Sequence, residues 1–96
     1  MNVPETIDAA TSVEASDNVY ARRFGDELIL LHFGRGEYYG LDPVGACIWE
    51  RCAAGETLGD IAREVVRSFD VDYRQALADV VALVGELRTA GLVKER

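Results

Sequence analysis

Residue types that could fasten a small domain covalently or hold a cofactor are scarce in this chain. Its 96 residues include two cysteines, two prolines, one tryptophan and one histidine. The N-terminus has no basic region followed by an apolar stretch, so it does not resemble a secretory signal. No apolar run approaches the roughly 18 residues that would span a bilayer. We therefore expect a cytoplasmic chain with reduced thiols and no membrane partner.

Positive charge is also in short supply. Ten Lys and Arg residues stand against 17 Asp and Glu residues, which gives a formal net charge of −7. Such a chain lacks the basic surface that neutralises nucleic-acid phosphates. It also lacks a polybasic face for anionic lipid. Binding to nucleic acid or to a membrane surface is therefore disfavoured.

Apolar residues are present in the amount that a globular domain needs, at 49% of the chain. They are unevenly distributed. Residues 1–17 are acidic, rich in Ala, Ser and Thr, and show no sustained periodicity. We expect these residues to form a mobile tail that folding does not require, and residues 18–96 to form one folded domain.

The folded part is predicted to open with three short strands. They cover residues 19–24, 27–33 and 37–41, joined by glycine-containing turns. Because the connections are short, the strands should form a meander with 37–41 at an edge. The middle strand is apolar on both faces, which favours a central strand covered on each side.

Three helices should follow, and their ends are marked by local signals. Asp42, Thr57 and Asp72 are suitable N-caps, and the first is followed by Pro43 at the first helical position. Glycines follow the expected ends of the first and third helices, at Gly55 and Gly91. The element order βββααα predicts an α+β domain with a small antiparallel sheet joined to a three-helix bundle.

The third helix, residues 73–90, is apolar over a wider arc than an amphipathic helix needs. At about 100° per residue the apolar arc covers about 160°. Its members are Leu83, Ala76, Leu87, Val80, Tyr73, Val84, Leu77 and Val81. Either the helix packs on two sides, or one flank stays open for a partner. An open flank beside an unpaired strand edge would suit an extended peptide.

Two runs of the sequence resemble the PqqD-like proteins, and the resemblance covers about residues 19–93. The runs are GRGEYYGLDPVGACIWERCAAGETLGDIA and DVDYRQALADVVALVGELRTAGLV. The resemblance implies a winged-helix-like βββααα domain without catalytic activity or cofactor. Such a domain binds the leader segment of a ribosomally made precursor peptide and presents the peptide to a maturation enzyme. That enzyme, a protease, a cyclase or a radical-SAM enzyme, would be encoded nearby.

The resemblance also implies where the leader binds, as a strand added to residues 37–41 beside the third helix. The predicted peptide-binding residues are Glu37, Tyr38, Tyr39, Gly40, Leu41, Leu77, Val80, Val81, Val84 and Arg88. The pathway stays open between quinone-cofactor synthesis, lasso-peptide synthesis and other modified peptides. Association with a second copy of the chain also stays open.

Catalytic and metal sites are weakly supported by the residues. Cys47 and Cys52 are five apart, outside the i, i+4 register, and have no second ligand pair. His32 lies in a predicted strand, where an ordinary half-buried role is more common than a dyad with a cysteine. Trp49 is a candidate peptide anchor, although packing is the commoner role of such a residue. We therefore predict no catalytic residue and no metal ligand.

The alternative function is that of a winged-helix DNA-binding regulator, because the fold class overlaps. A helix that reads DNA needs basic or amide side chains on its exposed face. The second helix offers only Arg63 and Arg67, and the third only Arg74 and Arg88, each beside acidic residues. Charge therefore favours the peptide-binding function.

Overall fold

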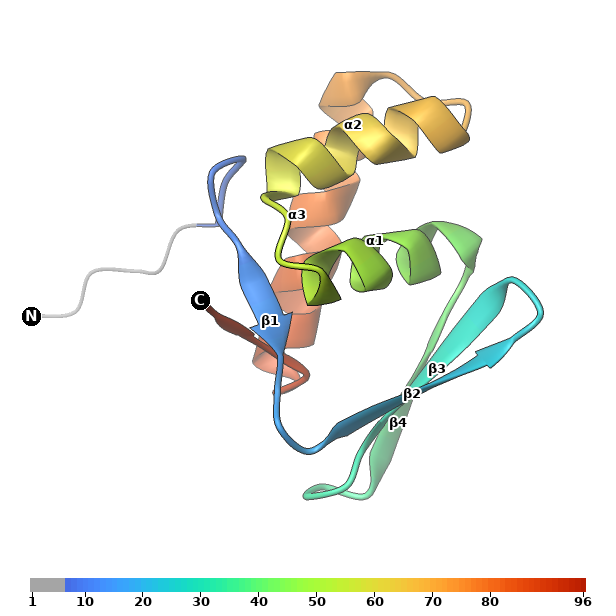
Figure 1. Ribbon diagram of the computed structural model, residues 1–96, viewed down its shortest axis with the longest axis vertical. Coiled ribbons are helices and arrows are strands. Elements are labelled where there is room, and N and C mark those ends of the chain that lie inside the picture. Colours follow the sequence, from blue (N-terminus) through green and yellow to red (C-terminus); the bar gives the residue numbers. More distant parts are fainter. Residues whose placement is uncertain (1–6) are drawn as a thin grey trace, which may run out of the picture.

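The computed structural model describes residues 7–96 and forms two antiparallel sheets and three helices. The strands are β1 (Val13–Ala15), β2 (Val19–Phe24), β3 (Glu27–His32), β4 (Glu37–Leu41) and β5 (Val93–Glu95), and the helices are α1 (Pro43–Ala53), α2 (Leu58–Ser68) and α3 (Tyr73–Thr89). In Figure 1 the sheet of β2, β3 and β4 lies beside α1, and α2 lies on the far side of α1. The predicted α+β class, with a three-stranded antiparallel sheet and three helices, is confirmed.

The three-stranded sheet has the order β2-β3-β4, so the predicted meander is confirmed. Leu28 and Leu30 of β3 point toward the helices and are buried. Ile29, between them, points to the opposite face and is 37% exposed. The expectation that β3 is covered on both faces is therefore wrong, because the helices lie on only one side of it.

Each helix begins at the predicted N-cap. The Gly45 amide donates to Asp42 Oδ1 at 2.8 Å, and the Gln75 amide donates to Asp72 Oδ1 at the same distance. The Asp60 amide donates to Thr57 Oγ1 at 3.2 Å. These bonds satisfy backbone donors that the first helical turn leaves without partners, which is why the local sequence marks the helix starts so well.

The N-terminal segment is part of the fold from at least Val13. β1 pairs antiparallel with β5, with Val13 opposite Glu95 and Ala15 opposite Val93. The Val13 side chain is fully buried. In Figure 1 these two short strands cross beside the helices, away from the larger sheet. The prediction of a mobile tail over residues 1–17 is therefore wrong for β1. Residues 1–6 lie outside the part of the chain that the structure describes.

The same segment also completes the start of α2. The Leu58 amide donates to the Thr11 carbonyl, and the Gly59 amide donates to the Ala9 carbonyl, both at 2.9 Å. These are two of the donors that a helix N-terminus leaves without intrahelical partners. A short segment of low hydrophobicity is therefore held mainly by backbone hydrogen bonds and by one buried valine, which composition does not reveal.

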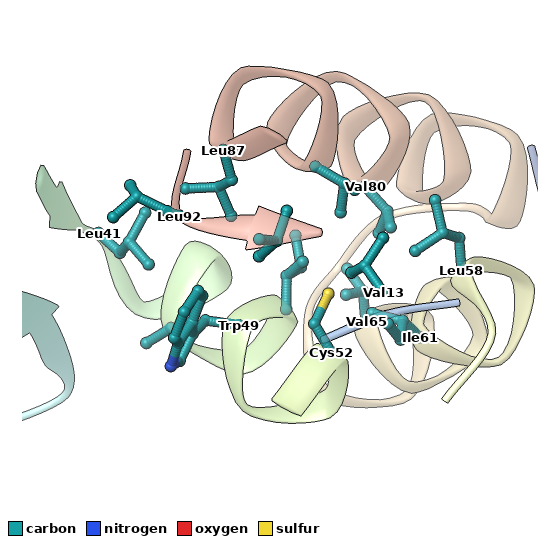
Figure 2. Close-up of a cluster of buried hydrophobic side chains, with 14 of the residues drawn as sticks. Val13, Leu41, Trp49, Cys52, Leu58, Ile61, Val65, Val80, Leu87 and Leu92 are labelled. Carbon is teal, nitrogen blue, oxygen red and sulfur yellow. The ribbon is translucent and has the colours of Figure 1, made fainter. Parts of the chain in front are cut away.

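The core lies between the three helices and β1, with Leu28, Leu30 and Leu41 joining it from the sheet. Figure 2 shows Val13 among side chains of α2, and Cys52 pointing into the same cluster. Trp49 is also part of the core and is 5% exposed. The candidate role of Trp49 as a peptide anchor is therefore wrong, because its ring packs in the core.

Candidate functional site

β4 is an edge strand with one free side. It pairs with β3 along its whole length, and within residues 7–96 no strand pairs with its other edge. Backbone N–H and C=O groups on such an edge can hydrogen-bond to an added extended chain. The predicted edge position of residues 37–41 is therefore confirmed, while their binding of a peptide stays a prediction.

A cleft of about 490 Å³ lies at the C-terminal end of β4. It is lined by the end of β4, the first turns of α1 and one flank of α3: Gly40, Leu41, Asp42, Val44, Gly45, Ile48, Asp79 and Leu83. A side chain projecting from a strand added to β4 could therefore enter a space bounded by two helices.

Close packing between β4 and α1 fixes one wall of this cleft. Pro43 is the first residue of α1, so the helix starts two residues after Leu41. A Cβ atom at Gly45 would stand 3.2 Å from the Cβ of Leu41 and 3.3 Å from Asp42 Oδ1. A side chain at Gly45 would thus crowd the side chains of Leu41 and Asp42 at this wall of the cleft.

The cleft has an apolar interior and an acidic rim. Val44, Ile48 and Leu83 contribute aliphatic side chains. Two carboxylates are also present in the lining, those of Asp42 and Asp79. Asp42 caps α1, and Asp79 accepts a hydrogen bond from Gln75 Nε2 at 2.9 Å. Such a lining can bury an apolar side chain while leaving polar groups at the entrance.

The helix residues predicted from sequence lie elsewhere than in this cleft. Val80 and Val84 are fully buried in the core, and Leu77 and Val81 are partly buried against it. Arg88 donates to Glu95 of β5 at 2.8 Å. The flank of α3 that lines the cleft carries Asp79 and Leu83 instead.

The cleft therefore adjoins a different flank of α3 from the predicted one, and peptide binding by the predicted residues stays a prediction. Leu83 and Val81 mark opposite ends of the apolar arc of α3, and sequence alone does not say which end faces β4. Both ends of the arc adjoin polar residues, Asp79 beside Leu83 and Arg74 beside Val81, so the pattern offers no signal that would choose between them.

Neither cysteine has the properties of a catalytic thiol. Burial raises the pKa of Cys52 to about 12, and nearby Glu56 adds to the rise. Burial also raises the pKa of Cys47, helped by Glu64. Because the thiolate is the nucleophile, both groups are held in the unreactive form near neutral pH.

A metal site and a DNA-binding surface gain no support from the described residues. Within residues 7–96, no three His, Cys, Asp or Glu side chains are grouped so as to hold a metal ion. The two arginines of α2 each pair with a carboxylate on the same helix, Arg63 with Asp60 and Arg67 with Glu64, at 2.6 Å. A DNA phosphate would have to compete with those carboxylates.

No helix in the part of the chain that the structure describes is long and apolar enough to cross a bilayer.

The fold and the cleft together define a small α+β domain to which an extended peptide can add a strand. The chain belongs to the PqqD family, since the family model for coenzyme PQQ synthesis protein D (PqqD) matches residues 27–93.

Solved structures agree with this assignment. One is TbiB1 in complex with the TbiA(beta) leader peptide, with 30% identity, a TM-score of 0.79, and 84% of this chain and 94% of that chain covered. Another is lasso peptide synthetase B1 complexed with the leader peptide, with 24% identity, a TM-score of 0.80, and 86% and 98% covered. No curated protein sequence matches this chain.

Proposed function

We propose that this domain binds the leader segment of a ribosomally made precursor peptide as a strand added to β4. The observation that carries the proposal is the free edge of β4 beside a cleft lined by α1 and α3. Support comes from the relative that is 30% identical and was solved with a leader peptide bound. The leader is the ligand class that fits both findings.

Backbone and side-chain contacts would play different parts in this binding. Hydrogen bonds to the five residues of β4 tolerate many sequences, because every non-proline residue offers the same backbone groups. Selectivity would come from a side chain of the leader that enters the cleft and contacts Val44, Ile48 and Leu83. Burial of that side chain away from water supplies a favourable term proportional to its apolar area.

The domain's contribution to maturation would be non-catalytic. The raised pKa values of both cysteines leave it without an activated thiol. Holding the leader raises the effective concentration of the attached precursor at a maturation enzyme that binds the same domain. The partner is thus an enzyme of peptide modification or cleavage, and a nucleic acid is disfavoured by the net charge of −7.

A substitution in the cleft tests the proposal. Peptides of about 12 residues, long enough to cover a strand edge, are selected from a random display library on the folded domain. Their affinity is then measured by fluorescence anisotropy. Leu83→Asp should weaken binding by about tenfold or more, because the new carboxylate must be desolvated where the peptide docks. Circular dichroism checks that the variant is folded, and Leu83→Ala serves as a milder second variant.

Ala78→Asp is the matched control, since Ala78 is exposed on α3 and lies outside the cleft lining. It should leave the affinity unchanged. The proposal is contradicted if the library yields no binder. It is also contradicted if both Leu83 variants, still folded, bind the selected peptides like the unchanged protein.

A further inference from the structure

Gly40 occupies a position in β4 where the fold does not require glycine. Its φ angle is not positive, unlike those of four other glycines of the described chain. A Cβ atom added at Gly40 would meet no atom of the described residues within 4 Å. Glycine in a strand interior weakens the strand, so the missing side chain has no benefit for stability. A strand glycine is often found where another chain or a ligand approaches closely.

The space above Gly40 belongs to a hollow of about 290 Å³. Its lining residues are Phe24, Glu27, Leu28, Ile29, Gly40, Leu41 and Asp42. Phe24 of β2 and Ile29 of β3 supply apolar walls, and they are 52% and 37% exposed. A hollow with exposed apolar walls and a backbone floor can accept an apolar side chain.

This hollow lies on the opposite face of the sheet from the helix-lined cleft. Gly40 is paired with Ile29, and paired residues in an antiparallel sheet point to the same face. Ile29 points away from the buried side chains of Leu28 and Leu30, hence away from the helices. The hollow and the cleft nevertheless share Gly40, Leu41 and Asp42 in their linings. They are therefore two faces of the same stretch of strand edge.

An extended chain added to that edge sends successive side chains to opposite faces. We infer that the bound peptide is recognised on both faces of the sheet: one side chain enters the cleft beside α3, and its neighbour, an apolar residue, enters the hollow above Gly40. Gly40 is then a specificity-determining residue, because a side chain there would take up part of the hollow, and a larger one would take up more. This inference rests on the proposed function and adds a second selective contact to it.

Filling the hollow tests the inference. A library-selected peptide is first chosen that slows amide exchange in β4 of the unchanged protein, so that strand addition is established independently. Gly40→Val should leave the thermal midpoint unchanged or higher, since valine favours strands and meets open space. It should weaken binding of that peptide by roughly tenfold, and Gly40→Ala should have a smaller effect.

The peptide provides the second arm of this test. Replacing its hollow-facing residue by alanine should weaken binding to the unchanged protein but cause little further loss with Gly40→Val. Such non-additivity shows that the two changes affect one contact. Two results would overturn the inference while leaving the proposed function intact. In one, the protein change and the peptide change lower the affinity independently of each other. In the other, Gly40→Val keeps the full affinity for a peptide that still protects β4. A peptide that never protects β4 would contradict the proposed function itself.

Removing a wall of the hollow keeps the inference testable if Gly40→Val fails to fold. Phe24 is half exposed, so Phe24→Ser should not unfold the domain, and it should lower affinity several-fold. Val66→Ser is the matched control, an exposed apolar residue of α2 that lines neither the hollow nor the cleft. Equal affinities of the two serine variants would contradict a role for the hollow.

Discussion

At the scale of single residues, burial decides what the cysteines can do. Cys52 is fully buried in the cluster shown in Figure 2, and its pKa is raised to about 12. The sequence predicted that neither cysteine is a metal ligand, because they are five positions apart, outside the i, i+4 register, and no second ligand pair exists. The size of the pKa change could not be predicted, since it depends on how many atoms from other elements surround the sulfur.

The raised pKa of Cys52 predicts a loss of stability at alkaline pH. In the unfolded chain this thiol ionises near pH 9, whereas in the folded chain it ionises near 12. The contribution of the Cys52 thiol to the free energy of unfolding is therefore fully present below pH 9 and is lost as the pH rises toward 12. The free energy of unfolding should fall by up to about 1.4 kcal/mol per pH unit from this group.

Denaturant titrations from pH 8 to about 10.5 measure this slope. Cys52→Ala should be less stable at neutral pH but should show a shallower alkaline decline than the unchanged protein. Parallel declines in the two proteins would mean that Cys52 ionises freely in the folded state.

At the scale of elements, local signals predicted more than long-range ones. All three helix starts and the β2-β3-β4 meander follow from caps, turns and alternation, which act within a few residues. β1 and β5 were missed because each has only three residues and forms only by pairing with the other, about eighty positions away. The flank of α3 at the cleft was not identified for a similar reason, since it depends on how α3 packs against α2 and β5.

The pairing of β1 with β5 predicts that the N-terminal segment stabilises the domain. Val13→Ala should lower the free energy of unfolding by about 2 kcal/mol, because a fully buried side chain loses its packing contacts. Glu14→Ala is the control, since its carboxylate makes only partly exposed ion pairs with Lys94 and Arg96, which contribute about 1 kcal/mol or less.

Thermal and denaturant unfolding of both variants measure the difference. A chain beginning at Asn18 should lose more stability than Val13→Ala does, because the carbonyls that bond to the start of α2 are removed as well. Equal stability of the Asn18 chain and the unchanged protein would restore the original expectation of a dispensable tail.

At the scale of the whole molecule, the fold places one strand edge where a helical cleft and a sheet hollow meet. The core holds α1 against the inner face of the sheet and α3 against α2, while β4 stays at the edge (Figure 1). The family and its fold were recognisable from the sequence, and the edge position of residues 37–41 followed from the short connections. The cleft and the hollow could not be predicted from the sequence, because their linings combine residues from β2, β3, β4, α1 and α3.

The sheet has two edges, and this gives the central claim an internal control. β2 is the other edge strand, and among the residues that the structure describes it pairs with β3 alone. Amide hydrogen exchange with and without a bound library-selected peptide compares β4 and β2 directly. Strand addition to β4 predicts slower exchange within residues 37–41 and unchanged exchange within residues 19–24. Slowing in β2, or on the helices alone with β4 unchanged, would contradict the account.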